Sequence, residues 1–232
     1  MFHLLELENC PIIEQLRIEE ALLRGTTLNW CITNYGAPKA LVMGISGKRE
    51  LLIDEGHLAK HPIPLVRRFT GGGTVVIDEN TAFMTIIANS NDLNVASFPQ
   101  EVAKWNSQLY ADILPHFALQ ENDYVIGDKK FGGNAQYLQK GRWLHHSSLL
   151  WDYSNEMMSY LLLPQKRPIY RKNRDHEKFL CSLKSHFLSP LHLLKTLLQE
   201  LKKKATLQRA QQSVVQEALL SSHRHSSLLL EL

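Results

Sequence analysis

The chain has 232 residues, of which 44% are hydrophobic, and this length suits one large domain or two small ones with a sizeable core. Its 26 basic and 23 acidic residues leave a formal net charge of +3, which argues against nucleic-acid binding but suits an acidic protein or a nucleotide as partner. The acidic N-terminal stretch is unlike a signal peptide and no apolar run reaches membrane-spanning length, so we expect a soluble, cytoplasmic protein that contacts no membrane.

The N-terminal half of the chain predicts one helix followed by short strands. Pro11 can open a helix that extends to about Arg24, and Gly25 ends it. Alternation from Leu28 to Ile32 predicts a strand. Further strands are predicted at residues 40–44, 64–69, 74–78 and 82–89. The short spacing of these strands favours antiparallel pairing.

The C-terminal half begins with the best helix signal, at residues 97–117, where apolar residues recur at spacings of three and four. Strands are then predicted at residues 123–127, 131–139 and 142–151, with a turn at 140–142. Helix signals dominate after residue 156, and the leucine stripe within residues 189–204 is expected to be core. The mixed signals of residues 221–232 predict no particular structure. This order of elements is typical of an α+β fold.

The three cysteines, Cys10, Cys31 and Cys181, lie far apart and form no Cys-x-x-Cys pair. This spacing favours neither a disulfide framework nor a zinc site. We therefore expect reduced thiols and no metal bound by a cluster of protein side chains.

Two glycine clusters stand directly beside cations. Residues 67–73 read Arg-Arg-Phe-Thr-Gly-Gly-Gly, and residues 129–133 read Lys-Lys-Phe-Gly-Gly. A turn needs only one or two glycines, whereas bare backbone can approach an anion or a carbonyl and donate N–H groups to it. The pair therefore suggests a carboxylate or phosphate cradle, although the fingerprints GxxxxGK[ST] and GxGxxG are absent. Two ordinary hairpin turns with solvated cations are the alternative.

Four sequence blocks resemble, in order, those of the lipoate–protein ligase A family. RRFTGGGTVV (67–76) resembles its Arg-Arg-x-[Ser/Thr]-Gly-Gly-Gly block, and KKFGGNAQ (129–136) resembles its Lys-x-[Ser/Gly]-Gly-x-Ala block. HHSSLLWD (145–152) is similar to a His-His segment that follows in the family, and RPIYRKNRDHEKFL (167–180) to a segment found especially in the plant-like branch.

The fold that this resemblance implies is the α+β catalytic domain shared with biotin protein ligases, in which helices pack a mixed, largely antiparallel sheet. Residues 1–232 would form one such domain. The residues after the last matched block are too few for the full C-terminal accessory domain of bacterial two-domain ligases. A second polypeptide in place of that domain is therefore left open.

The activity that the resemblance implies has two steps. The carboxylate of lipoate, or of octanoate, attacks the α-phosphate of ATP, supplied with Mg²⁺, and an acyl-adenylate forms. The ε-amine of a lysine on an acceptor protein then attacks that mixed anhydride. The implied acceptors are the lipoyl domains of 2-oxoacid dehydrogenase complexes or the glycine-cleavage carrier protein.

The resemblance also implies roles for individual residues. Lys130 is the implied catalytic lysine, in contact with the acyl carbonyl and the phosphate, and Lys129 is the alternative. The implied contacts of lipoate or the acyl-adenylate are Arg68, Thr70, Gly71, Gly72, Gly73, Gly132, Gly133, Ala135 and His146. Nucleotide or acceptor contacts are implied for Arg67, Arg171 and Arg174, with a salt-bridge cluster at a helix start as the alternative for the last two.

Two features keep other functions open. Val76, Ile77 and Asp78 stand where many family members have a His-Asp pair, and only one of the adjacent His145 and His146 can face a site from a strand. A related branch moves octanoyl groups between carrier proteins through a cysteine thioester without ATP. Cys181 is the only candidate nucleophile for such an octanoyltransferase or amidotransferase, and a role as a small buried hydrophobic residue is favoured over it. A non-catalytic acyl-binding module is the third hypothesis.

Overall fold

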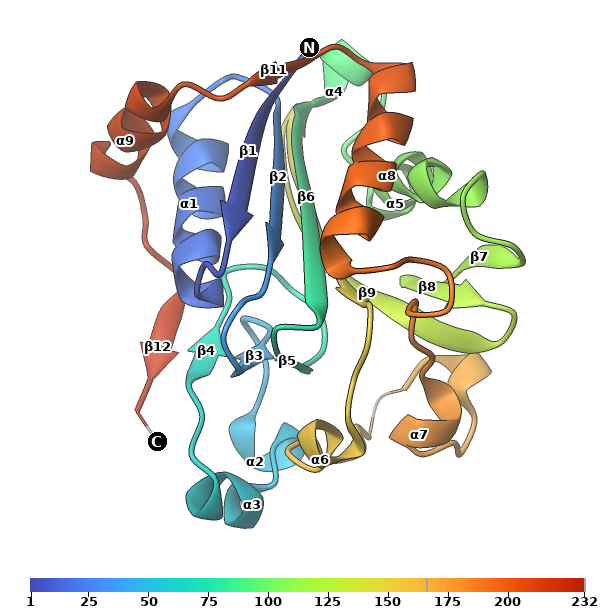
Figure 1. Cartoon of the computed structure of the whole chain (residues 1–232). Helices are drawn as coiled ribbons and strands as arrows, with labels where there is room; N and C mark the ends of the chain where they lie inside the picture. Colours follow the sequence, from blue (N-terminus) through green and yellow to red (C-terminus); the bar gives the residue numbers. More distant parts are fainter. Residues whose placement is uncertain (166, 232) are drawn as a thin grey trace.

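Two β-sheets meet in the computed structural model, which describes residues 1–165 and 167–231 (Figure 1). The eight-stranded sheet has the order β11-β1-β2-β6-β10-β9-β8-β7, and the four-stranded sheet has the order β12-β4-β3-β5. The strands of the large sheet are β1 (Phe2–Glu8), β2 (Trp30–Tyr35), β6 (Thr81–Asn89), β7 (Phe117–Gln120), β8 (Asp123–Ile126), β9 (Lys129–Gln139), β10 (Arg142–Leu150) and β11 (Leu207–Arg209). Those of the small sheet are β3 (Ala40–Met43), β4 (Leu65–Arg67), β5 (Val75–Ile77) and β12 (Leu228–Leu230).

The pairing of the strands is mixed and mostly antiparallel. Strand β1 runs parallel to both β2 and β11, and β3 runs parallel to β4. The remaining strand pairs of the described residues are antiparallel. The expected α+β fold with a mixed, largely antiparallel sheet is therefore confirmed.

Helices cover both faces of the large sheet (Figure 1). Helices α1 (Ile12–Gly25) and α9 (Gln212–Leu220) lie on one face, where Trp30 and Ile32 of β2 are buried. Helices α5 (Pro99–Ala111) and α8 (Pro190–Lys204) lie on the other face, over Cys31 of the same strand. Strand β2 is buried on both faces because it lies between these layers.

The start and the buried face of helix α8 follow from its local sequence. The side chain of Ser189 caps its start by accepting a hydrogen bond from the backbone N–H of His192, and Pro190 occupies the first turn. Of the predicted leucine stripe, Leu194, Leu198 and Leu201 are buried and Leu191 is partly buried. The expectation that this stripe is core is confirmed.

Shorter helices frame the small sheet and the end of the β9–β10 region. They are α2 (Arg49–Leu52), α3 (Glu55–Lys60), α4 (Ser90–Leu93), α6 (Asn155–Met158), α7 (His176–Phe179) and a 3₁₀ turn at Ile169–Arg171. Within residues 1–165 and 167–231, no helix is both long and apolar enough to cross a membrane.

Two expectations about the elements were wrong. Strands β4 and β5 do not pair with each other, because residues 68–74 carry the chain across β3, which pairs with both, and β6 belongs to the large sheet. The helix predicted at residues 97–117 ends at Ala111, and β7 begins at Phe117. Pro115 explains the early end, because the residue before a proline disfavours helical backbone.

Candidate functional site

A cavity of about 540 Å³ is lined by residues of both sheets and lies in the usual size range for small-molecule sites. Strands β5, β9 and β10 contribute to its walls, together with the glycines of residues 71–73. Part of the chain between residues 161 and 180 completes the lining.

Arg68 holds the glycines of residues 71–73, here called the glycine loop. Its buried guanidinium donates from Nη2 to the carbonyl oxygens of Gly71 at 3.0 Å and Gly73 at 2.8 Å, and from Nη1 to that of Val42 at 3.3 Å. Burial lowers the pKa of Arg68 to about 10, which leaves the group charged at neutral pH. These hydrogen bonds of Arg68 thus hold the backbone of the glycine loop in place.

The three glycines of this loop serve different purposes. Gly72 has a φ of +108°, and a Cβ atom there would lie 2.7 Å from Nη2 of Arg68, so this position requires glycine. A Cβ atom on Gly71 or Gly73 would meet no described atom within 4 Å. These two glycines therefore leave the cavity wall bare, as expected of a loop that lets a ligand approach its backbone.

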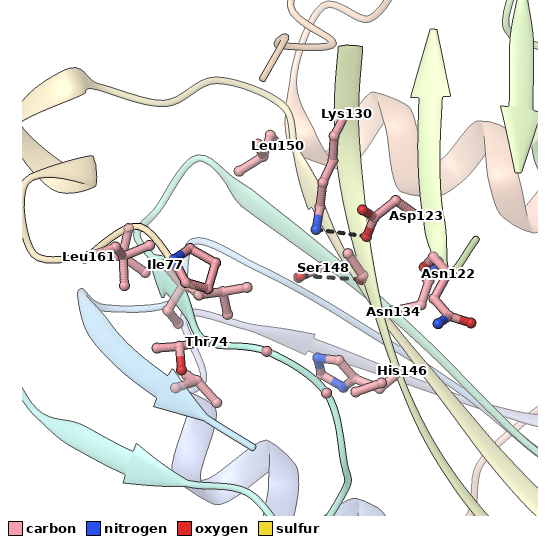
Figure 2. Close-up of a pocket in the computed structure, with 18 of the residues that line it drawn as sticks. Thr74, Ile77, Asn122, Asp123, Lys130, Asn134, His146, Ser148, Leu150 and Leu161 are labelled. Atoms are coloured by element: carbon pink, nitrogen blue, oxygen red, sulfur yellow. Dashed lines mark hydrogen bonds and ion pairs between the residues drawn. The ribbon is translucent and has the colours of Figure 1, made fainter. Parts of the chain in front are cut away.

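Lys130 points into the cavity from β9. Its Nζ atom lies 2.8 Å from Oδ1 of Asp123 on the neighbouring strand β8, as Figure 2 shows. The other oxygen of Asp123, Oδ2, accepts a hydrogen bond of 2.8 Å from the hydroxyl of Tyr170. Lys129 is exposed and does not contribute to the lining.

The two glycines after Lys130 face opposite sides of β9. A Cβ atom on Gly133 would lie 3.4 Å from Nζ of Lys130, on the cavity side. A Cβ atom on Gly132 would press within 3.0 Å of Leu149 and 3.2 Å of Tyr124. Gly133 therefore gives room to the lysine, whereas Gly132 gives room to the packed side chains behind the strand.

Of the two adjacent histidines, only His146 faces the cavity. Its Nδ1 atom lies 2.9 Å from Oε1 of Glu19, a buried residue of α1, and 3.0 Å from the hydroxyl of Thr85. His145 points to the opposite face of β10, between Tyr124 and Gln136. Burial, with a smaller contribution from His146, lowers the pKa of His145 to about 3.

Arg171 brings a second cation to the cavity. It is buried, its guanidinium stacks 4.5 Å from the ring centre of Phe179, and its Nη2 atom has no hydrogen-bond partner among the described residues. Burial lowers the pKa of Arg171 and, more strongly, that of His176, which also lines the cavity, to about 4. The ring of His176 is thus neutral at pH 7.

The structure brings most of the implied site residues together. Those that line the cavity are Lys130, Arg68, Gly71, Gly72, Gly73, Gly133, Ala135, His146 and Arg171. Those outside the lining are Thr70, Gly132, Arg67 and Arg174. Arg67 donates to the carbonyl oxygens of Ile45 and Gly47, and Arg174 contacts Asp128 at 2.9 Å.

Sequence reasoning overlooked Glu19 and Asp123. Glu19 lies in a helix with other acidic residues, and nothing in its neighbourhood distinguishes it. Asp123 carried a usable signal, because it begins the predicted strand of residues 123–127, which precedes the second glycine cluster, and in the structure it pairs with Gly133.

The chain belongs to the lipoyl protein ligase A/B catalytic domain family, whose model matches residues 11–218. It is 29% identical to the inactive lipoate–protein ligase 2 of Plasmodium falciparum, over 83% of this chain and 66% of that protein. It is 32% identical to the lipoate–protein ligase of Streptococcus pyogenes serotype M5, over 51% of this chain and 35% of that protein. The chain thus spans less than two thirds of the length of these relatives.

Solved structures share the fold at low sequence identity. A Thermoplasma acidophilum protein with bound lipoic acid has a TM-score of 0.74 and 18% identity, and the match covers 93% of this chain and 92% of that one. A lipoate–protein ligase A bound with ATP has a TM-score of 0.71 and 17% identity, and that match covers 94% and 93% of the two chains. These matches confirm the expected catalytic-domain fold.

Proposed function

We propose that this chain is the acyl-activating and acyl-transferring domain of a lipoate–protein ligase. It binds lipoate or octanoate in the cavity, activates the carboxylate with ATP to an acyl-adenylate, and transfers the acyl group to a lysine of an acceptor lipoyl domain. The observation that carries this proposal is the meeting of two cations, Lys130 and Arg171, with the bare glycine loop in the lining of one cavity.

The charges of this site suit both steps of the reaction. Formation of the adenylate and its attack by an amine both build negative charge on phosphate and carbonyl oxygens. Cations and backbone N–H groups that are already in place stabilise such charge without reorganisation. Ile12, Val75 and Phe83 add apolar lining against which an acyl chain can pack.

The transfer step breaks one bond and forms another. The amine nitrogen of the acceptor lysine attacks the acyl carbonyl carbon, the C–N bond forms, and the C–O bond to AMP breaks with its electron pair on the phosphate oxygen. The proton of the amine passes to solvent. Lys130 and Arg171 would hold the phosphate on which the leaving charge develops.

A magnesium ion would enter with ATP. In nucleotide sites Mg²⁺ is bound by phosphates, waters and one or two carboxylates, and Glu121 and Asp123 are the carboxylates among the residues that line the cavity. Because Lys130 and Tyr170 already contact the two oxygens of Asp123, Glu121 would supply the carboxylate, and the ion would neutralise charge on the phosphates. No group of three or more His, Cys, Asp and Glu side chains within the described part of the chain is placed to hold a metal by itself.

The similarity to a Plasmodium ligase that is named inactive favours a second candidate function. In this alternative the chain accepts a preformed acyl-adenylate and transfers its acyl group, while another polypeptide carries out adenylation. A Thermoplasma acidophilum structure with a TM-score of 0.73 and 18% identity is described as a bipartite ligase with its E2 lipoyl domain. That description supports a lipoyl domain as acceptor and a second polypeptide as partner. A cytoplasmic location stays a prediction.

Two assays on the purified chain test these functions. Lipoate-dependent exchange of pyrophosphate into ATP is expected if the chain adenylates. Transfer from synthetic lipoyl-adenylate to a lipoyl domain, without exchange, would support the second candidate. Failure of both assays would overturn the proposed function, and transfer from octanoyl carrier protein without ATP would replace it with the octanoyltransferase reading.

A further inference from the structure

A chain of polar contacts leads from Lys130 out of the cavity. Asp123 is buried, and each of its two carboxylate oxygens has a partner. Its Oδ1 atom lies 2.8 Å from the ammonium of Lys130, and its Oδ2 atom accepts a 2.8 Å hydrogen bond from the hydroxyl of Tyr170. Tyr170 belongs to the 3₁₀ turn Ile169–Arg171 and so lies far from both partners in the sequence. Three elements therefore meet at one carboxylate.

The segment that bears Tyr170 also contacts the β7–β8 turn, the β8–β9 turn and β9. The backbone N–H of Ile169 donates to Glu121 at 2.7 Å, and the guanidinium of Arg174 donates to Asp128 at 2.9 Å. The backbone N–H of Cys181 donates to the carbonyl oxygen of Lys130 at 2.9 Å. The position of Tyr170 relative to the hairpin is thus set by contacts on either side of it.

The hydroxyl of Tyr170 limits how Asp123 can hold the lysine. A carboxylate with both oxygens free can bind an ammonium through either oxygen or through both. A donor fixed on Oδ2 sets the rotation of the carboxylate and leaves Oδ1 for Lys130. Burial, followed by the charge of Asp123, raises the pKa of Tyr170, so the hydroxyl stays a donor at neutral pH.

We infer that Tyr170 is a positioning residue, which orients Asp123 and thereby aims the ammonium of Lys130 into the cavity. The next residue, Arg171, lines the same cavity. An anionic group that contacts Arg171 would therefore touch the 3₁₀ turn that bears Tyr170. This inference deepens the proposed function, and its catalytic consequence rests on that function.

The first test measures the accessibility of Lys130 without any reaction of acyl groups. Full-length protein is treated with an amine-reactive reagent, and the labelling of Lys130 is followed by peptide mass spectrometry. In Tyr170→Phe, Asp123 can hold the ammonium with both oxygens, so labelling of Lys130 should become about two- to tenfold slower, the range that one hydrogen bond contributes. Labelling of the exposed Lys129 should not change and serves as the internal control.

Tyr153→Phe is the matched control variant. The hydroxyl of Tyr153 also donates to this segment, to the carbonyl oxygen of Leu180 at 3.4 Å, but Tyr153 does not line the cavity. Its loss should leave the labelling of Lys130 as in wild type. Equal labelling of Lys130 in wild type and Tyr170→Phe would overturn the inference, as would an equal slowing in Tyr153→Phe.

The second test measures single-turnover transfer from synthetic lipoyl-adenylate to a lipoyl domain, with ATP and Mg²⁺ left out. Tyr170→Phe should slow transfer about tenfold while the dissociation constant of the adenylate stays close to wild type. If Tyr170 acts through Asp123, the double variant Tyr170→Phe/Asp123→Asn should be no slower than Asp123→Asn alone. Additive losses would overturn the inference. A wild-type chain that transfers nothing, but whose Lys130 labelling responds to Tyr170→Phe, would instead refute the proposed function.

Discussion

Lys129 and Lys130 are adjacent and carry the same charge, but only Lys130 reaches the cavity. We expect Lys130→Ala to lower single-turnover acyl transfer by about 10²–10³, the typical value of one preorganised donor. Lys129→Ala should stay within a few-fold of wild type, because an exposed charge contributes little. Circular dichroism should be used to check that both variants are folded. A larger loss in Lys129→Ala would show that the other face of β9 carries the chemistry.

Cys181 lies outside the cavity lining, half-buried, with its thiol 3.5 Å from the carbonyl oxygen of Lys129. Burial raises the pKa of this thiol, so little thiolate is present at neutral pH. Cys181→Ser should therefore leave acyl transfer within a few-fold of wild type. Mass spectrometry after incubation with octanoyl carrier protein checks this, and an acyl adduct on Cys181 would favour the octanoyltransferase reading.

His145 should make the free energy of unfolding depend on pH. The pKa of His145 is about 3 in the folded protein and near 6.5 in the unfolded chain. Between these two pH values the unfolded chain binds a proton at His145 and the folded protein does not. The contribution of His145 to the free energy of unfolding is fully present above pH 6.5. It falls as the pH is lowered toward 3, by at most about 1.4 kcal/mol per pH unit. His145→Gln should lose less stability than wild type between pH 7 and pH 5.

Urea unfolding at the two pH values measures this difference. His186→Gln, which removes an exposed histidine, is the control and should keep the wild-type dependence. His176 also contributes to the slope, but it is retained in both variants. An unchanged slope in His145→Gln would mean that His145 takes up its proton equally in the folded and unfolded states.

Site residues that belong to a short local pattern can be predicted from the sequence. Residues that the fold brings to the site from a distant part of the chain cannot. Lys130 and Gly133 are found because glycine and lysine stand together in one short stretch. Glu19 contacts His146 from a position 127 residues away, and no local pattern encodes that distance. The neighbourhood of a glycine cannot be predicted either: the resemblance implies a ligand contact for Gly132, whereas the structure shows that a Cβ atom there would meet Leu149 and Tyr124.

The glycine loop lies between β4 and β5, and Gly72 and Gly73 should respond differently to substitution. Gly73→Val should leave the free energy of unfolding near the wild-type value and abolish lipoate binding, because its side chain enters open cavity space. Gly72→Ala should destabilise the fold by about 1 kcal/mol or more, since φ is +108° and the methyl group meets Arg68. Isothermal titration with lipoate and urea unfolding measure the two effects. Normal binding by Gly73→Val would show that the loop has only a structural role.

Several elements with a long periodic pattern were predicted, but the strand β1 was missed, and the partners of the strands were not predicted. Helices α1 and α8 and the strands of the β9–β10 hairpin follow from apolar spacing and local turn residues. The insertion of β3 between β4 and β5 depends on where residues 68–74 lead the chain, which no local pattern sets. Strands β11 and β12 have three residues each, too few for any pattern to appear.

The cavity is lined by both sheets and by the segment around Arg171, so a bound ligand contacts all three parts of the chain. Lipoyl-adenylate should therefore raise the free energy of unfolding of the whole chain, by about 2.7 kcal/mol at a concentration of 100 times its dissociation constant. Thermal unfolding across a ligand titration measures this shift. A melting temperature that does not move with ligand concentration would argue against binding in this cavity.

The strands β1 and β4 each pair with a strand that is synthesised much later, β11 and β12 respectively. Neither sheet can therefore be completed until late in synthesis. Residues 2–4 pair with 207–209, and residues 65–67 pair with 228–230. A ribosome that adds about 5–20 residues per second needs roughly 10 to 40 s to produce the partner of β1. During that time the β1 edge of the large sheet and the β4 edge of the small sheet have no partner strand and can pair with another chain. Aggregation of the nascent protein should therefore begin at β1 and β4, and slower translation should increase it.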